Sequence, residues 1–144
     1  AYHELKALGL PAITGAAAAA PGEGEAWRGA DVRAGLKLAR IIGARPYAEQ
    51  VVQISVANYD RRQRRSEPAL LLLTDQGEIM WGNAPGEEAP YEPSVEQKLA
   101  NLKRVAETHG GRIDAGGFPN RVDVQLVGRA MIYTEAPVRY TNGR

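Results

Sequence analysis

The chain has 144 residues, of which 44% are hydrophobic and 24% are charged. This length is typical of a single domain, and the composition is that of an ordinary globular protein. A formal net charge of +1 excludes a strong overall field for nucleic acid or anionic lipid, so partners must be inferred from local features. The absence of cysteine excludes disulfides, cysteine nucleophiles and zinc sites built from thiolates.

No apolar run approaches the roughly 20 residues that cross a bilayer, and no signal peptide opens the sequence. The chain begins at Ala1 rather than at a methionine, so we expect it to be part of a longer protein. We expect residues 1–144 to form one domain. Residues 16–29 are rich in alanine, glycine and proline without an amphipathic period, which predicts a flexible loop.

The first helix is predicted from Asp31, because apolar residues recur at helical spacing from Val32 to Ile42. Asp31 is placed to cap this helix and Gly43 to end it. A half-buried strand should follow, since Val52, Ile54 and Val56 alternate with less apolar residues.

Two more strands are predicted around a tight turn. The run Leu70–Leu73 is apolar at every position, which is typical of a central strand covered on both faces. The sequence Asp75-Gln76-Gly77 then predicts a turn that the Asp75 side chain caps, with Gly77 able to take positive φ. The next strand is expected at 78–81.

A long loop between Asn83 and Pro93 precedes the second predicted helix. Ser94, with Gln97 three residues later, forms a capping box. One apolar stripe follows it, made of Val95, Leu99, Leu102 and Ala106.

The last extended run covers residues 122–133, and Gly128 in its middle predicts a bend or bulge. These elements predict an α+β fold, with a mostly antiparallel β-sheet of about five strands and two helices packed on one face.

The order of these motifs resembles the β domain of the FtsQ/DivIB bacterial cell-division septal proteins. The resemblance lies in Leu10-Pro11-Ala12-Ile13-Thr14-Gly15, the turn with Trp81-Gly82, the helix containing Lys98, and Val122-Asp123-Val124. In that family a cytoplasmic tail, one membrane-spanning helix and a small domain precede the β domain; all three are absent from this chain. The alanine-rich loop, the arginine-rich hairpin and the long loop before Ser94 depart from the family pattern.

The resemblance implies a non-enzymatic scaffold of the bacterial divisome, on the extracytoplasmic face of the cytoplasmic membrane, in the periplasm or on the cell-wall side. It implies partners of the FtsB (or DivIC) and FtsL type, a role in septum assembly, and regulation of septal peptidoglycan synthesis. The membrane anchor would be a helix outside this chain. We expect no catalytic residue, no cofactor and no metal.

The final strand suggests a binding mechanism that does not depend on the family. A strand that ends a sheet exposes unpaired N–H and C=O groups, to which an extended partner segment can add as another strand. The predicted partner-binding residues are Val127, Arg129, Met131, Ile132, Tyr133 and Thr134.

An enzymatic role has little support in the sequence. His3 lies in a polar segment, and His109 falls in the last turn of its helix, where capping or surface roles are typical. No nucleophile elbow, zincin motif or phosphate-binding loop is present. Asp75 and Glu78 could pair across their turn as two glycosidase carboxylates, but turn capping explains Asp75 better. Asp114 and Asp123 have no support as metal ligands, and an unrecognised hydrolase remains an alternative.

A second alternative is a phosphate- or nucleic-acid-binding module that uses the cluster Arg61, Arg62, Arg64 and Arg65. Solvated charge is the favoured interpretation, because Tyr59 is the only aromatic residue beside the cluster. Trp81 and Tyr91 either mark a binding surface, or Trp81 is buried against the helix that begins after Ser94.

Overall fold

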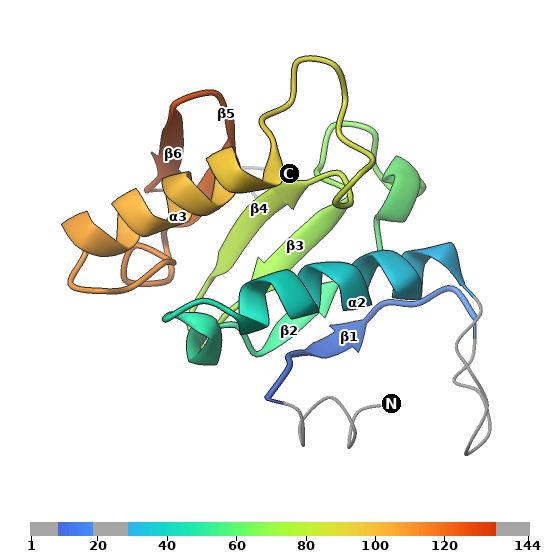
Figure 1. Cartoon of the computed structure of the whole chain (residues 1–144), viewed down its shortest axis with the longest axis horizontal. Helices are drawn as coiled ribbons and strands as arrows, with labels where there is room; N and C mark the ends of the chain where they lie inside the picture. Colours follow the sequence, from blue (N-terminus) through green and yellow to red (C-terminus); the bar gives the residue numbers. More distant parts are fainter. Residues whose placement is uncertain (1–8, 19–28, 135–144) are drawn as a thin grey trace, which may run out of the picture.

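The computed structural model describes residues 9–18 and 29–134, which form a six-stranded sheet with two α-helices over one face (Figure 1). Most of the predicted loop 16–29 lies outside the described residues. The α+β class, the mostly antiparallel sheet and the two helices on one face are confirmed. The expected number of strands was too low by one, because β1 is only three residues long and lacks a clear alternation.

The strands lie in the sheet in chain order, from β1 to β6. Their bounds are β1 Ala12–Thr14, β2 Gln53–Ser55, β3 Leu70–Leu73, β4 Glu78–Gly82, β5 Arg121–Leu126 and β6 Arg129–Tyr133. The helices are α2 Ala30–Gly43 and α3 Val95–Thr108, and the short 3₁₀ turns are η1 Ala48–Gln50 and η2 Tyr59–Arg61.

Two of the strand pairs are parallel, β1 with β2 and β4 with β5, and the other three are antiparallel. Parallel neighbours need a long crossover connection. α2 lies in the connection between β1 and β2, and α3 lies in the one between β4 and β5. The fold therefore contains two β-α-β units, joined by the antiparallel strands β2, β3 and β4.

The core lies between the helices and one face of the sheet. α2 packs over β1 and β2, and α3 packs over β5 and β6. Ile54, Leu72, Ile79 and Trp81 are fully buried on this face, which confirms the interpretation that buries Trp81. Tyr91 is exposed.

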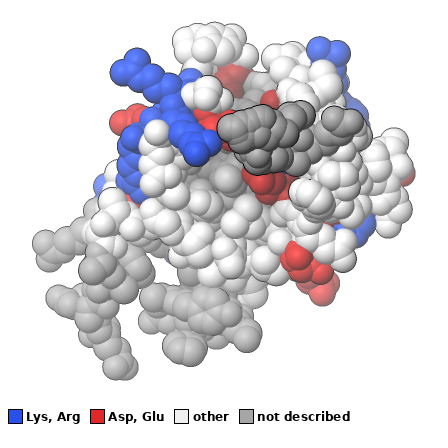
Figure 2. Space-filling model, turned by 180° about the vertical axis from the view of Figure 1, so that it is seen from behind, with Lys and Arg blue, Asp and Glu red and all other residues white. Residues whose placement is uncertain are grey.

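The two faces of β3 are not equally covered. Leu70 and Leu72 are fully buried, whereas Leu71 and Leu73 are only half-buried. The prediction of a strand covered on both faces is wrong within the described part of the chain, because both helices lie on the same side. On the opposite face, Lys and Arg side chains form separate groups near the margins (Figure 2).

The start of α2 differs from the prediction. The N-cap residue is Gly29, and no side chain caps the helix. Asp31 lies in the first turn, where its carboxylate accepts hydrogen bonds from the backbone N–H groups of Ala17 at 2.9 Å and Val32 at 2.8 Å. Because Asp31 is not the N-cap residue, its carboxylate can accept the Ala17 N–H and so connect α2 to the segment after β1.

The turn between β3 and β4 is capped by Thr74 rather than by Asp75. The Thr74 hydroxyl accepts hydrogen bonds from the N–H groups of Gln76 at 3.2 Å and Gly77 at 2.8 Å. Asp75 instead pairs with Arg112 at 3.0 Å. Gly77 does not take positive φ; its lack of a side chain matters because a Cβ there would lie 3.1 Å from the Cα of Gly117.

The capping box of α3 is confirmed. Gln97 N–H donates to the Ser94 hydroxyl, and Ser94 N–H donates to the Gln97 side chain. The buried face differs in part from the predicted stripe, since Val95 and Ala106 are only half-buried. Its buried residues are Lys98, Leu99, Asn101, Leu102 and Val105.

Candidate functional site

The last two strands form a β-hairpin at one side of the sheet. Leu126 pairs with Arg129, so Val127 and Gly128 make a two-residue turn, and Gly128 has a φ of 78°. The prediction of one extended run with a bend or bulge at Gly128 is therefore wrong. A glycine in a two-residue connection between alternating segments is itself a hairpin signal, which the sequence contains.

β6 is an edge strand of the described sheet. It pairs with β5 along one side, and no strand within residues 9–18 and 29–134 pairs with its other side. In an antiparallel pair, successive residues direct their N–H and C=O groups alternately toward and away from the neighbour. About half of the backbone polar groups of β6 therefore face away from β5.

The predicted partner-binding residues divide between the two faces of this edge. Ala130 and Ile132 pack against the core, so the Ile132 side chain serves the fold rather than an outer surface. Since side chains alternate along a strand, Arg129, Met131 and Tyr133 lie on the face away from the helices. Tyr133 is 47% exposed, and Val127 in the turn is 66% exposed. Thr134 is exposed directly after the strand.

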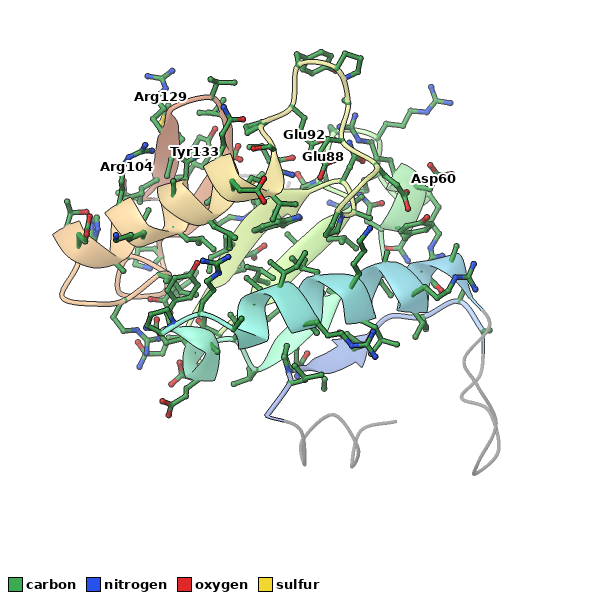
Figure 3. All side chains as sticks on the ribbon, in the orientation of Figure 1. Asp60, Glu88, Glu92, Arg104, Arg129 and Tyr133 are labelled. Atoms are coloured by element: carbon green, nitrogen blue, oxygen red, sulfur yellow. The ribbon has the colours of Figure 1, made fainter. Side chains whose placement is uncertain are left out.

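α3 holds the hairpin in place through two polar side chains. The buried Asn101 amide donates to the carbonyls of Val124 at 3.1 Å and Leu126 at 2.9 Å. Arg104 donates to the Asn101 side chain at 2.6 Å and to the Gly128 carbonyl at 3.2 Å. Figure 3 shows Arg104 on α3 beside the hairpin that carries Arg129 and Tyr133. These bonds fix both ends of the turn.

The sequence analysis missed Asn101 and Arg104. Asn101 lies next to Leu102 on the buried side of α3. Polar residues on a helix are by default assigned to the solvent face, and no local pattern identifies carbonyl groups more than 20 residues away as their partners.

A buried ion pair connects α3 to the loop before it. Lys98 is fully buried and pairs with Glu92, and its ammonium lies 5.0 Å from the centre of the Trp81 ring, within cation–π range. Glu92 also accepts hydrogen bonds from the N–H groups of Asn83 and Ala89, both at 2.9 Å. Figure 3 shows Glu92 and Glu88 together in this loop. Glu92 thus fastens the loop 83–93 onto the sheet and α3.

Burial acts on the two members of this pair in opposite directions. It lowers the pKa of Lys98, against the opposing effect of Glu92. Burial alone would raise the pKa of Glu92, but the hydrogen bonds from Lys98, Ala89 and Asn83 outweigh it and lower that pKa. Gly82 lies beside the pair, with a φ of 111°, and a Cβ there would be 2.5 Å from a Glu92 carboxylate oxygen. Only glycine fits this position.

The arginine cluster does not behave as one solvated group. Arg62 turns inward and donates to the carbonyls of Gly15 at 3.1 Å, Val56 at 3.0 Å and Ala57 at 3.0 Å. It also pairs with the Asp31 carboxylate at 3.0 Å. All four arginines are exposed, as the solvated-charge interpretation predicts, but Arg62 is also bonded to the fold.

The remaining candidate chemical groups have structural partners. Asp75 pairs with Arg112, and Glu78 pairs with Arg121 at 2.9 Å, so these two carboxylates have different cations. The buried Asp114 accepts from Arg112 at 2.6 Å and from Thr74 at 2.7 Å. Asp123 accepts from the N–H and the side chain of Gln125.

His109 has a structural role at the end of α3. His109 is the C-cap of α3, with Nδ1 at 3.0 Å from the Val105 carbonyl oxygen, as the capping interpretation expected. His3 lies outside the described residues. Within residues 9–18 and 29–134, no group of three or more His, Cys, Asp or Glu residues is placed to hold a metal ion.

Comparisons with protein-family models, with curated proteins and with solved structures found no match for this chain. In the part of the chain that the structure describes, no helix is long and apolar enough to cross a membrane.

Proposed function

We propose that this chain is the extracytoplasmic β domain of a cell-division septal protein of the FtsQ/DivIB type. In this role it is a non-enzymatic scaffold of the bacterial divisome. It binds division proteins of the FtsB or DivIC and FtsL type, supports septum assembly and regulates septal peptidoglycan synthesis. A helix outside this chain anchors it to the cytoplasmic membrane.

The observation that carries the proposal is the edge strand β6. Its outer backbone groups have no partner strand among the described residues. An extended segment can add to such an edge through main-chain hydrogen bonds, with side-chain contacts supplying specificity. Asn101 and Arg104 hold the hairpin from α3, so the edge is already ordered before a partner arrives. Pre-ordering reduces the entropic cost of binding.

A second observation concerns the residues in which the resemblance lies. Trp81, Gly82 and Lys98, three residues in which the resemblance lies, meet in one buried cluster with Glu92. Their contacts constrain one another closely, which gives a physical reason for this combination of residue types at these positions.

The proposal predicts that Tyr133→Ala weakens partner binding without unfolding the domain. Tyr133 is half-exposed on the outer strand, and truncation of an interface aromatic often costs about 2 kcal/mol or more, or roughly a 30-fold loss of affinity. The measurement is a calorimetric titration with the extracytoplasmic segment of an FtsB- or DivIC-type partner, with circular dichroism to confirm folding.

The matched control is the double variant Arg64→Ala with Arg65→Ala. Both arginines are exposed and lie in the loop after η2, away from β6. We expect this variant to bind the partner as the parent does. Strong binding by a folded Tyr133→Ala variant, combined with loss of binding in the arginine variant, would place the site on the arginine loop and refute the proposal.

A further inference from the structure

β6 lacks the features that usually keep an edge strand from pairing with another chain. Those features include proline, several charged side chains, and a bulge in the edge strand itself. Residues 129–133 contain no proline and only one charged residue, Arg129 at the start. The bulge of this hairpin lies in β5, which has one residue more than β6 between two successive residue pairs. β6 is therefore a regular edge, on whose outer side no described strand is paired.

The hairpin turn determines which backbone groups of β6 face outward. Leu126 and Arg129 flank a two-residue turn, so they exchange hydrogen bonds, and the N–H and C=O groups of Arg129 point toward β5. The direction of these groups alternates from one residue to the next along a strand. The N–H and C=O groups of Ala130 and Ile132 therefore point away from β5.

These outward groups match those of a second copy of the same strand. A copy that runs antiparallel, about a twofold axis at Met131, pairs every residue of β6 with another residue of β6. Ala130 then lies opposite Ile132 of the copy, and each such pair exchanges both of its main-chain hydrogen bonds. Any other register that joins outward groups leaves part of the strand opposite the turn or opposite residues beyond the strand.

The side chains agree with this register. Arg129 and Tyr133 are exposed near opposite ends of β6 (Figure 3), and the register places Arg129 of one copy opposite Tyr133 of the other. This is a non-hydrogen-bonded position, where side chains come closest. A guanidinium within about 6 Å of an aromatic ring is attracted to it, and the pairing makes this contact twice. The two copies of Arg129 are roughly 13 Å apart along the strands, beyond the screening length of about 8 Å at physiological salt.

We propose that β6 pairs with β6 of a second copy of this chain, antiparallel and centred on Met131. The two sheets then form one continuous sheet with the helices of both copies on the same face. The interface of two five-residue strands is small, so the dimer is weak and depends on concentration. It occupies the same backbone groups as an extended partner and excludes it. This competition rests on the proposed function, whereas the dimer itself does not.

The absence of cysteine makes disulfide trapping a direct test. Met131→Cys places two thiols at the centre of the dimer, with Cα atoms about 4.5 Å apart, which is within disulfide range. Under mild oxidation this variant should form a covalent dimer at least tenfold faster than Val127→Cys, a control in the exposed turn that faces no copy of itself. Arg129→Cys alone should match the control, whereas a mixture of Arg129→Cys and Tyr133→Cys should cross-link.

The chain without cysteine gives an independent measurement. Sedimentation velocity between about 10 µM and 1 mM should show a shift from monomer toward dimer. Tyr133→Ala should raise the dissociation constant roughly tenfold, because it removes both cation–π contacts. Arg64→Ala, at an exposed position outside β6, should leave it unchanged.

Other results would overturn the proposal. They are a chain that stays monomeric at the highest concentration, a Met131→Cys rate equal to that of Val127→Cys, or efficient cross-linking of Arg129→Cys with itself. A dimer that Tyr133→Ala leaves intact would also contradict it. Addition of the extracytoplasmic segment of an FtsB- or DivIC-type partner should slow the cross-linking of Met131→Cys. If it does not, the dimer stands and the proposed partner site on β6 fails.

Discussion

Arg62 is bonded to three backbone carbonyls and to the carboxylate of Asp31. Through these bonds one side chain connects the segment after β1, the first turn of α2 and the segment after β2. The Asp31 side chain is only 5% exposed, so its negative charge depends on this partner and on the N–H groups of Ala17 and Val32. A charge held in this way is costly to leave unpaired.

We therefore expect Arg62→Ala to lower the free energy of unfolding by about 2–4 kcal/mol, since it removes several charge-assisted hydrogen bonds and leaves the Asp31 carboxylate without its cationic partner. Arg64→Ala removes a charge of the same kind from an exposed position and should change stability by less than about 0.5 kcal/mol. Urea unfolding followed by circular dichroism measures both. Equal, small losses would mean that the Arg62 contacts contribute nothing.

Acid should weaken the fold through three carboxyl groups. Asp31, Glu92 and Asp114 all have a pKa below its usual value, because their hydrogen bonds and cationic neighbours outweigh the opposing effect of burial. A carboxyl whose pKa is lower in the folded than in the unfolded state adds stability above the unfolded value. The ordinary values are 3.8 for the aspartates and 4.5 for Glu92.

The stabilisation from these groups should thus be complete near pH 6 and fall as the pH drops below about 4.5 through the folded-state values. Thermal melts between pH 7 and pH 2.5 record this. Glu92→Gln should reduce the stability at pH 7 and flatten the decline. A melting temperature that does not change between pH 6 and pH 3 would contradict the assignment.

At the scale of elements, α3 contributes to three separate parts of the structure. Its N-terminal turn is fixed by the capping box, its buried face completes the core, and Asn101 and Arg104 hold the β5–β6 turn. Only some of its apolar residues contribute to the core. Leu102 is fully buried there, whereas Val95 is only half-buried.

This difference predicts unequal costs for similar truncations. Leu102→Ala should lower the free energy of unfolding by about 2–5 kcal/mol, because it leaves a cavity in a packed core. Val95→Ala should cost less than about 1 kcal/mol, since a half-buried side chain loses less. Chemical denaturation of the two variants in parallel gives the comparison. Comparable losses would show that both residues face the core alike.

The two helices and the strands β2 to β4 follow from local patterns. The 3.6-residue period of α2 and α3, the Ser94 box and the alternation in 52–56 each act over a few residues, so they can be read directly. β1 was missed as a strand because three residues carry too little pattern, and its parallel partner β2 lies about 40 residues away.

The site was only partly predictable for the same reason. The edge position of the last strand could be inferred from its place in the chain, and strand parity then assigns Tyr133 and Ile132 to opposite faces. The inward turn of Arg62 and the bonds from Asn101 to β5 could not be inferred, because their partners are carbonyl groups that only the folded topology brings near.

At the scale of the whole molecule, both β-α-β crossovers lie on the same side of one sheet, and this arrangement determines which surfaces are free (Figure 1). One edge of the described sheet is the three-residue β1, and the other is the five-residue β6. β6 offers the longer edge, and its hairpin is held from α3. Strand addition is therefore expected at β6.

Amide hydrogen exchange of the domain, alone and with the extracytoplasmic segment of an FtsB- or DivIC-type partner, tests this claim most directly. If the partner adds as a strand, the N–H groups of β6 that face away from β5 become slow to exchange, while those already bonded to β5 change little. The protected residues should alternate along 129–133. If a saturating concentration of the partner leaves the exchange of the β6 amides unchanged, binding at the edge strand is contradicted.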